Sequence, residues 1–404
     1  MKILLINVTC RQGSTGKIAY DLYAEFKKAG HKAAVCYGRG PLIDEPDIYK
    51  FTHDWEVNLH ALKTRLTGYV GKGNLAATRR LIRYIESFNP DVVHLQNIHG
   101  YYVDAYKLLS YLKQNVIPTV ITMHDEWLFT GKCGYPYGCE GWRNSCGNCP
   151  SLSEYPKSPF FDRTAKEFDI KRKIFCDFNN VIFVPVSVWL KNAARQSQYL
   201  MNKHFEVIHN GIDTEVFMPT DAKALKKKLG LGDEKVLLHV TPNFDDLRKG
   251  GKYILDLARR LGPEIVKVII VGAHKPVKNS SGNIIWIPKT EKQKELAAYY
   301  SLADIFILTS EMESLPTVCL EALCCGTPVA GFDCGGTKET APEGYGVFVP
   351  YGNMEELERV VGLALKGEIA LAEAEACAEY GRRHYGKETM GEAYLKIYDM
   401  VGSL

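Results

Sequence analysis

Short apolar runs alternate with amphipathic segments along almost the whole chain of 404 residues. Residues 2–8 ("KILLINV") are nearly continuously apolar, whereas in residues 14–30 the apolar positions recur every four residues before a glycine. The first pattern predicts a buried strand and the second an amphipathic helix. Further strands of the first kind are expected at residues 32–38, 91–97, 118–125 and 181–187. Such strands, separated by helices, indicate a parallel sheet that is covered on both faces.

The same alternation restarts in the second half, with strands expected at residues 235–241, 266–272, 283–288, 304–310 and 327–333. The fold class predicted is therefore α/β, with two doubly wound Rossmann-like domains facing each other across a cleft. We place the first domain at residues 1–208 and the second at 209–386, and expect the last helix, 387–404, to return to the first domain. Ligands of open α/β sheets bind outside the carboxyl ends of the strands, so the functional residues are expected there.

Composition and charge narrow the class of protein. The N-terminal run is too short for a signal peptide, and no apolar run reaches the roughly 18 to 20 residues of a membrane span, so we expect a cytoplasmic protein. Residues 1–208 carry 27 Lys and Arg against 19 Asp and Glu, and the remainder carries 23 against 28. The basic half is therefore expected to meet an anionic ligand. No recognised nucleic-acid motif accompanies this charge, which argues against a nucleic-acid partner.

Residues 310–339 hold the most informative motif, "SEMESLPTVCLEALCCGTPVAGFDCGGTKE". A strand is expected to end at Ser310, Ser314 is expected to cap a helix with Pro316 in its first turn, and Gly326 is expected to close it. The N–H groups of a first helical turn make an anion site. Glu313 and Glu321 could accept hydrogen bonds from sugar hydroxyls, so the stretch fits a nucleotide sugar. A surface helix with two ordinary glutamates is the alternative.

Two other stretches point to the same ligand. Arg248 and Lys249 follow a predicted strand directly before a helix, a placement that suits neutralisation of a diphosphate, although a solvated charge pair is also common there. The turn "RQGSTGK" (11–17) brings glycines to the end of the first strand. Because it lacks the spacing of a dinucleotide-binding or P-loop motif, an oxidoreductase or an ATPase is disfavoured.

Taken together, "VIHNGIDTEVF", the "RKGG" turn, the two glutamates eight residues apart, "EALCCGTPVAGFDCGG" and the final helix resemble a family 4 retaining glycosyltransferase of the GT-B fold. The resemblance extends over essentially the whole chain and is specific in its second half. It implies a hexosyltransferase-type enzyme of bacterial polysaccharide biosynthesis, similar to the colanic-acid branch. A nucleotide-sugar 2-epimerase of the same fold and a catalytically silent sugar-nucleotide-binding protein remain as alternatives.

The resemblance also implies roles for individual residues. Glu321 would bind the nucleotide ribose, Arg248 and Lys249 would neutralise the diphosphate, and His124 of "TMHDEW" would lie over the donor sugar. The remaining donor contacts would come from Glu313, the backbone of Ser314, Leu315 and Pro316, Asn210 of the "HNGID" run, and Gly13 of the first loop. Contacts to the base are expected around residues 287–293, with UDP favoured over GDP.

The chain departs from the family at one place: the Gly-Arg usual at the end of the first strand of the second domain is replaced by "HVTPNF" (239–244). More of the phosphate charge would then fall on Arg248. The family is described as using front-face attack within an ion pair, which places the demand on stabilising the departing diphosphate. The chain has no Asp-x-Asp pair, so no catalytic metal is expected.

Four cysteines lie within residues 131–150, "GKCGYPYGCEGWRNSCGNCP". Cys133, Cys139, Cys146 and Cys149 have the economy of a structural zinc site, although the spacing is not that of a standard finger. Four unpaired thiols rank second, and two disulfides suit an exported protein. We expect a possible structural zinc that braces the loop after His124.

Residues 62–88 carry six cations against Glu86, namely Lys63, Arg65, Lys72, Arg79, Arg80 and Arg83. With Leu, Ile and Tyr at helical spacing, this segment could make peripheral contact with an anionic membrane at its inner face or bind a lipid-linked acceptor. A solvated helix face is the alternative. The partners expected are thus a nucleotide-sugar donor and a saccharide or lipid-linked acceptor.

Overall fold

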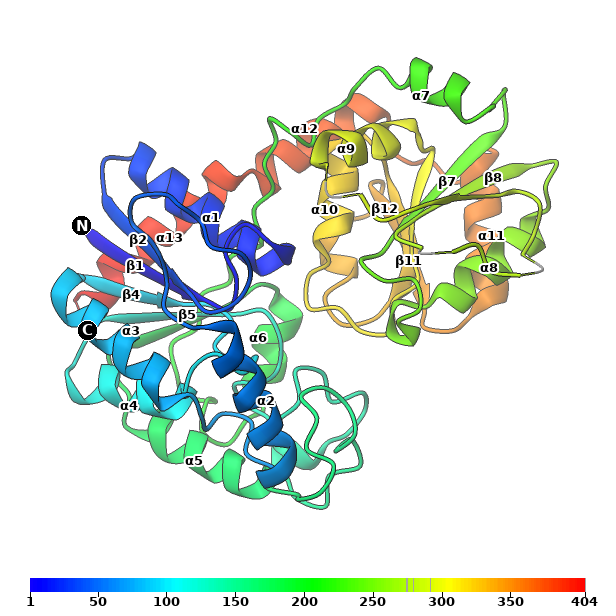
Figure 1. Ribbon diagram of the computed structural model, residues 1–404. Coiled ribbons are helices and arrows are strands. Elements are labelled where there is room, and N and C mark those ends of the chain that lie inside the picture. Colours follow the sequence, from blue (N-terminus) through cyan, green and yellow to red (C-terminus); the bar gives the residue numbers. More distant parts are fainter. Residues whose placement is uncertain (274, 279, 291, 404) are drawn as a thin grey trace. The chain divides into compact units, whose positions relative to one another are not determined.

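The structure is a computed structural model that describes residues 1–273, 275–278, 280–290 and 292–403. The chain divides into two compact units, one of Met1–His209 together with the residues from Met390 on, and one of Asn210–Thr389. Each unit is built on one six-stranded parallel sheet (Figure 1). The predicted fold class, two doubly wound Rossmann-like domains, is confirmed in this respect.

The sheet of unit 1 has the strand order β3-β2-β1-β4-β5-β6. Its strands are β1 (Lys2–Asn7), β2 (Lys32–Tyr37), β3 (Ile48–Lys50), β4 (Val92–Leu95), β5 (Thr119–Met123) and β6 (Val181–Pro185). Its helices are α1 (Gly13–Lys28), α2 (Asp54–Thr67), α3 (Leu75–Phe88), α4 (Ala105–Gln114), α5 (Thr164–Cys176), α6 (Val188–Ala194) and α13 (Lys387–Val401), of which the last begins in unit 2. A 3-10 turn, Gly141–Arg143, lies in the cysteine-rich loop.

Helices cover both faces of this sheet because its strands are apolar on both sides. On one face, side chains of α1 and α13 such as Leu22 and Ile397 join Ile3 and Leu5 in a single buried cluster. Figure 1 shows α3, α4 and α5 on the opposite face. The last helix is also held by polar contacts, since Tyr398 Oη lies 2.7 Å from His94 Nδ1. The last helix therefore packs on unit 1.

Unit 2 repeats the topology, with the strand order β12-β11-β10-β7-β8-β9. Its strands are β7 (Lys235–Val240), β8 (Val266–Val271), β9 (Ile284–Ile287), β10 (Ile305–Leu308), β11 (Val329–Asp333) and β12 (Gly346–Pro350). Its helices are α7 (Lys223–Lys228), α8 (Gly251–Leu261), α9 (Gln293–Leu302), α10 (Thr317–Cys324), α11 (Met354–Leu365) and α12 (Ala374–Tyr385), with 3-10 turns at Leu247–Lys249 and Lys338–Thr340. Helices α8 and α11 supply one buried cluster against the sheet.

In each sheet the chain adds strands first toward one edge and then toward the other. The change occurs between β1 and β4 in unit 1 and between β7 and β10 in unit 2. Loops leave the sheet on opposite faces at such a point, and the space between them is where open α/β sheets bind ligands. In unit 2 the loop after β7 holds Arg248 and Lys249, and the loop after β10 holds Glu313. The topology thus brings the separate sequence motifs to one edge of the sheet.

The basic segment 62–88 is not one element, because α2 ends at Thr67 and α3 begins at Leu75. In α3, Leu81 and Ile85 are buried under the sheet. Its apolar spacing is therefore that of an ordinary covering helix. Within the described residues, no helix is long and apolar enough to cross a membrane.

Candidate functional site

An ion pair links the two switch-point loops of unit 2. Lys249 Nζ lies 2.6 Å from Glu313 Oε1, although the two residues are 64 positions apart. Burial alone would lower the pKa of Lys249, but the Glu313 carboxylate outweighs it and the pKa is raised. Lys249 therefore holds a positive charge at the edge of the sheet.

The backbone conformation of Gly250 fixes Lys249 in place. Gly250 has a φ of +69°, and a Cβ there would lie 1.9 Å from the carbonyl oxygen of Thr309 at the end of β10. The hydroxyl of Thr309 donates in turn to the Gly250 carbonyl at 3.0 Å. Only glycine can take this conformation at this distance, so the "RKGG" turn sets the position of the cation.

A second glycine holds Glu313. Gly335 has a φ of +68°, and a Cβ there would lie 2.1 Å from the Glu313 carbonyl oxygen. The N–H of Gly336 donates to that oxygen at 2.8 Å. The glycine pair after β11 thus packs against the Glu313 loop. Glycine is needed at Gly335 because a side chain there would collide with that loop.

The helix after this loop begins later than predicted. Helix α10 starts at Thr317 with Pro316 as its N-cap, so the assignment of Ser314 as the cap is wrong. Ser314 is buried, and its Oγ has no hydrogen-bond partner among the residues that the structure describes. Helix α10 ends at Cys324, just before Gly326 with its φ of +88°. Leu315 is also tied down, since Asn210 Nδ2 donates to its carbonyl at 3.4 Å.

Glu321 lies on α10 and is buried, with 8% of its surface exposed. Tyr300 on α9 donates from its hydroxyl to Glu321 Oε2 at 2.9 Å. A buried carboxylate needs such donors to remain ionised. Tyr300 is a partner that the sequence did not single out.

Arg248 is held differently from Lys249. Its Nε lies 2.9 Å from Asp246 Oδ1 and its Nη2 lies 2.6 Å from Asp246 Oδ2, which is a two-point contact. This contact lowers the pKa of Asp246. The Arg248 guanidinium thus lies in the loop after β7, as predicted, and the Asp246 carboxylate is its partner there.

The segment that replaces the family's Gly-Arg, residues 239–244, begins with a buried histidine. His239 is the fifth residue of β7, and its Nδ1 lies 3.0 Å from the Ile307 carbonyl. Burial lowers the pKa of His239 to about 4, so it is neutral near pH 7. In the predicted base-binding segment 287–293, Ile287 ends β9 and Gln293 begins α9. Residues 288–290 and 292 lie between them, and Glu291 lies outside the described residues.

His124 follows β5 in unit 1, at the carboxyl edge of that sheet. Its Nε2 lies 3.2 Å from Gln96 Oε1. Burial lowers the pKa of His124 to about 4 despite the nearby Asp125. A neutral imidazole can donate or accept a hydrogen bond, and it adds no charge to the site.

A hollow of about 410 Å³, open to solvent, lies at the switch point of unit 1. Its lining is mixed polar and apolar and includes Gln12, Arg39, Asn97, His99 and Tyr155. This hollow was missed from the sequence because its residues come from four separate loops. Its size suits a small polar ligand.

His99 in this hollow is hydrogen-bonded to the residue after His124. Its Nε2 lies 2.7 Å from Asp125 Oδ2, and Asp125 Oδ1 accepts the Trp127 N–H at 2.9 Å. Burial would raise the pKa of Asp125, but these partners lower it. The stretch "HDEW" could have indicated a role for Asp125, because a carboxylate beside a candidate site histidine commonly orients an imidazole ring.

Gly13 lies at the start of α1 with a φ of +66°, and nothing is within 4 Å of a Cβ placed there. Glycine is therefore required for conformation, and the space beside it is open. The close approach in this loop occurs at Gly16, where a Cβ would lie 2.5 Å from Thr9 Oγ1.

The four cysteines of the loop after β5 line one small cavity together with Trp142 and Lys132. They do not form the expected zinc site: within the part of the chain that is described, no group of three or more His, Cys, Asp or Glu side chains could hold a metal ion. Cys133 and Cys149 are hydrogen-bonded to each other. Cys146 Sγ accepts the Gly131 N–H at 3.1 Å. The sulfur atoms of Cys133, Cys146 and Cys149 are thus hydrogen-bonded, and none of the twelve cysteines forms a disulfide.

Two buried lysines brace this loop instead. Lys132 Nζ donates to the carbonyls of Leu152, Glu154 and Pro156 at 2.8–3.1 Å. Lys171 Nζ donates to the Trp127 carbonyl at 2.6 Å, and burial lowers the pKa of Lys171 to about 8. Sequence reasoning missed both, because a lysine in a polar loop or helix is usually solvated.

Comparison with known proteins defines the class. The topology is that of GT-B glycosyltransferases: sucrose-phosphate synthase from Thermosynechococcus elongatus superposes with a TM-score of 0.73 at 16% identity, covering 100% of this chain and 99% of that one. Anabaena Alr3699/HepE, solved in complex with UDP-glucose, gives 0.67 at 15% identity and covers 100% of both chains.

Sequence comparison defines the family. Residues 15–216 match the family model of Glycosyltransferase Family 4, and residues 219–384 match that of Glycosyl transferases group 1. The chain is 28% identical to the putative colanic acid biosynthesis glycosyl transferase WcaC of Escherichia coli K12, over 98% of this chain and 99% of that protein. It is 30% identical to N-acetyl-alpha-D-glucosaminyl L-malate synthase of Bacillus anthracis over 35% of this chain and 39% of that protein. The protein belongs to glycosyltransferase family 4, and its predicted family is confirmed.

Proposed function

We propose that this glycosyltransferase transfers a hexosyl group, with retention of configuration and without a catalytic metal, from a nucleotide-diphosphate sugar to a saccharide or lipid-linked acceptor of cell-surface polysaccharide. A UDP-sugar is the favoured donor and a GDP-sugar the next. Support for UDP comes from Anabaena Alr3699/HepE, a protein of the same fold that is solved with UDP and with UDP-glucose.

The observation that carries this proposal is the arrangement at the switch point of unit 2. Lys249 and Glu313 meet there at 2.6 Å, next to the loop that leads to the N-terminus of α10. A fixed cation and free helical N–H groups attract a diphosphate. We assign Lys249 and Arg248 to the diphosphate, and we assign Glu313 with the backbone of residues 314–316 to the donor sugar.

The other donor contacts follow from burial and hydrogen bonding. Glu321, oriented by the Tyr300 hydroxyl, would accept hydrogen bonds from the ribose hydroxyls. Asn210 would act through Leu315, whose carbonyl it holds. The resemblance assigns Gly13 to the phosphate side and His124 to the donor sugar, and we keep both as proposals.

The proposed chemistry needs no protein nucleophile. The acceptor oxygen attacks the anomeric carbon on the face from which the diphosphate departs. Negative charge grows on the diphosphate as its bond to that carbon breaks, and the departing phosphate oxygen then takes the proton of the acceptor hydroxyl. Lys249, whose positive charge is held by Glu313, and Arg248 would stabilise that charge in the transition state.

We propose that the acceptor binds in the hollow at the switch point of unit 1. Arg39, Asn97 and His99 offer donors and acceptors there for sugar hydroxyls. His99 is oriented by Asp125. We also propose that the protein works in the cytoplasm, where its twelve free thiols would stay reduced.

A thermal-shift screen of the pure protein against UDP, GDP, ADP and their sugar conjugates, without and with magnesium, tests the donor site. A rise with one diphosphate that is lost in Glu321→Ala and Arg248→Ala supports the proposal and identifies the base. Transfer or slow hydrolysis of the donor then separates a transferase from a silent binder, and formation of a 2-epimer would identify the epimerase. No response to any nucleotide would contradict the proposal.

A further inference from the structure

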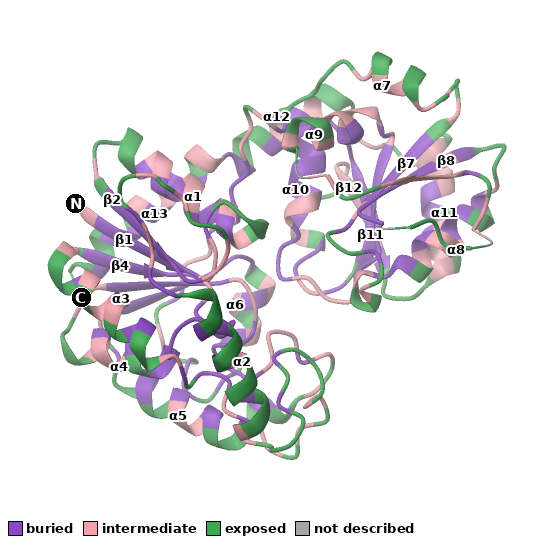
Figure 2. Ribbon diagram, in the orientation of Figure 1, coloured by how far each residue is buried: buried purple, intermediate pink, exposed green. Residues whose placement is uncertain are grey.

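Helix α2 of unit 1 turns a row of large apolar side chains toward solvent. Trp55, Leu59, Leu62 and Leu66 are 64%, 56%, 50% and 54% exposed. Figure 2 shows α2 largely in the colour of exposed residues. Single exposed apolar residues are ordinary on a protein surface, but four on one helix form a patch that calls for a partner.

The four side chains form one stripe, which we call the α2 stripe. At about 100° per residue, positions 55, 59, 62 and 66 fall within about 60° of the helix circumference. Lys63 and Arg65 fall about 80° to either side of Trp55 on the same wheel. Cations that flank an apolar stripe on both sides are typical of a helix lying in a membrane interface.

The inner face of α2 is polar, which is the reverse of an ordinary covering helix. Glu56, His60 and Thr64 are buried together with Val57. His60 Nε2 lies 3.1 Å from the Lys72 carbonyl. Burial lowers the pKa of His60 to about 4, so the inner face is uncharged at this position near pH 7.

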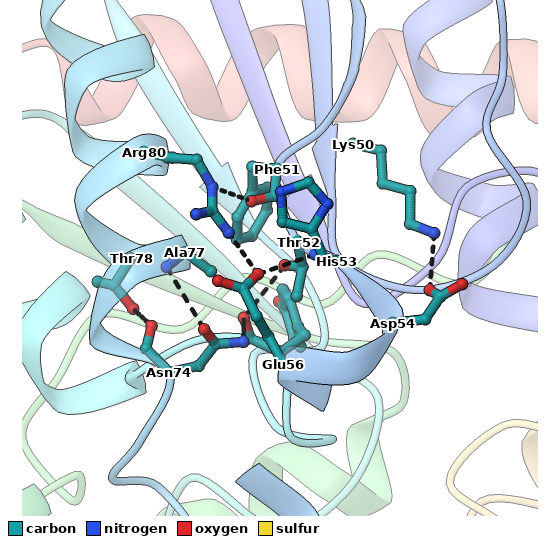
Figure 3. Close-up of polar contacts among 11 residues, drawn as sticks. Lys50, Phe51, Thr52, His53, Asp54, Glu56, Asn74, Ala77, Thr78 and Arg80 are labelled. Carbon is teal, nitrogen blue, oxygen red and sulfur yellow. Dashed lines mark hydrogen bonds and ion pairs between the residues drawn. The ribbon is translucent and has the colours of Figure 1, made fainter. Parts of the chain in front are cut away.

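Polar contacts fix this orientation at the start of the helix (Figure 3). Glu56 forms an ion pair with Arg80 of α3 and accepts the His53 N–H at 2.8 Å. Arg80 Nε also donates to the Phe51 carbonyl at 2.8 Å. Rotating α2 to bury the stripe would break these contacts and expose paired charges. The apolar face is therefore held outward.

A basic hollow of about 380 Å³ lies at the end of the stripe. Leu66 and Phe161 line it together with three cations, Lys63, Lys72 and Arg163, and no acidic residue. A hollow lined by three cations matches an anionic headgroup in charge.

We propose that the α2 stripe and the basic hollow dock this protein on an anionic phospholipid bilayer, with the stripe buried at the level of the acyl-chain boundary and the hollow around a lipid phosphate. The docking element is α2 and not the whole basic segment 62–88, because Leu81 and Ile85 of α3 are in the core. Half of the stripe, Trp55 and Leu59, precedes that segment. This inference does not depend on the identity of the donor.

Co-sedimentation with vesicles tests the proposal. The full chain is mixed with phosphatidylcholine vesicles and with equimolar phosphatidylcholine and phosphatidylglycerol. We expect binding to the anionic vesicles that weakens with added salt. The variant Leu59→Glu/Leu62→Glu should lose it, whereas Leu42→Glu/Met201→Glu, at two other exposed sites, should keep it.

The cations are tested separately. Lys63→Gln/Arg65→Gln should weaken binding about thirtyfold, since each cation near an anionic surface contributes about 1 kcal/mol. Lys28→Gln/Lys107→Gln removes the same charge elsewhere on unit 1 and should have a much smaller effect. A blue shift of tryptophan fluorescence on vesicle binding should be reduced in Trp55→Phe.

Three results would overturn the proposal. Wild-type protein that stays in solution with the anionic vesicles is the first, and undiminished binding of Leu59→Glu/Leu62→Glu is the second. The third is a wild-type dimer in sedimentation velocity that the same variant dissociates, because the stripe would then cover a second copy of this chain. Melting temperatures of all variants in the absence of vesicles should match the wild type, since every substituted side chain is at the surface.

Discussion

Lys249 and Glu313 form a 2.6 Å ion pair that joins the loop after β7 to the loop after β10. Both loops are positioned by glycines whose backbone φ is positive and whose neighbours leave no room for a side chain. The pair therefore occupies a fixed position before any ligand arrives. Fixed charges of this kind need no reorganisation as negative charge develops on a leaving group.

Replacing Lys249 by glutamine should reduce kcat/KM for the nucleotide sugar about a hundredfold, because one fixed donor to the departing diphosphate is lost. Glu313→Gln should also lower it, since Lys249 would lose its partner. Steady-state kinetics of both single variants and the double variant measure their coupling.

The matched control for this pair is Lys252→Gln, which removes an exposed lysine three residues further along the same loop and helix. Its kcat/KM should stay within about twofold of the wild type, as a solvated charge contributes little. Single-variant losses that simply add in the double variant would show that the ion pair has no role in catalysis.

Gly250→Ala should destabilise unit 2 by about 3 kcal/mol and weaken nucleotide binding. The positive φ accounts for about 1 kcal/mol, and the clash with the Thr309 carbonyl accounts for the rest. Gly230→Ala is the control, because Gly230 also has a positive φ of +66° but nothing within 4 Å of its Cβ position. Denaturant unfolding measures both, and equal losses would contradict the clash.

Tyr300→Phe should weaken nucleotide binding about fivefold to tenfold, because Glu321 loses the hydroxyl that donates to it at 2.9 Å. The ring stays in place, so the fold of unit 2 should be retained. Isothermal titration with the diphosphate found in the screen measures the change. Tyr299→Phe, at the neighbouring buried tyrosine, should bind like the wild type.

A strand could be predicted from the sequence where its own residues form a continuous apolar run. Residues 305–308, for example, are apolar throughout and form β10, which lies in the middle of its sheet. The edge strands β3 and β12 were missed: β3 has only three residues, and β12 runs from a glycine to a proline. Short edge strands are formed by their neighbours, and that information is not local.

The sequence allowed the residues of the candidate site to be predicted, but it did not show which residues contact one another. Arg248, Lys249, Glu313 and Glu321 do lie near the edge of one sheet, but the sequence could not show that Asp246 or Tyr300 would be their partners. The cap at Ser314 was wrong because Gly335 and Gly336 hold the preceding loop extended up to Pro316. The reversed orientation of α2 depends on Glu56 meeting Arg80. Such pairings arise only when distant segments pack.

Glu126 gives the protein a pH dependence of stability with a defined sign. It is buried next to Asp125, and its Oε1 has no hydrogen-bond partner in the described part of the chain. Burial raises the pKa of Glu126 to about 8, well above the ordinary value of 4.5. The folded state therefore keeps this proton at neutral pH, whereas the unfolded state releases it.

Between pH 4.5 and about pH 8 the unfolded state is favoured increasingly by this release, so Glu126 lowers the free energy of unfolding as the pH rises. Glu126→Gln removes the titration while keeping the shape of the side chain. We expect no gain in stability at pH 4.5 and a gain of about 1 to 3 kcal/mol at pH 8. Unfolding in urea at several pH values measures the difference, with Glu140→Gln as the control at an exposed glutamate. A gain that is the same at both ends of this range would mean that Glu126 is ionised in the folded protein throughout.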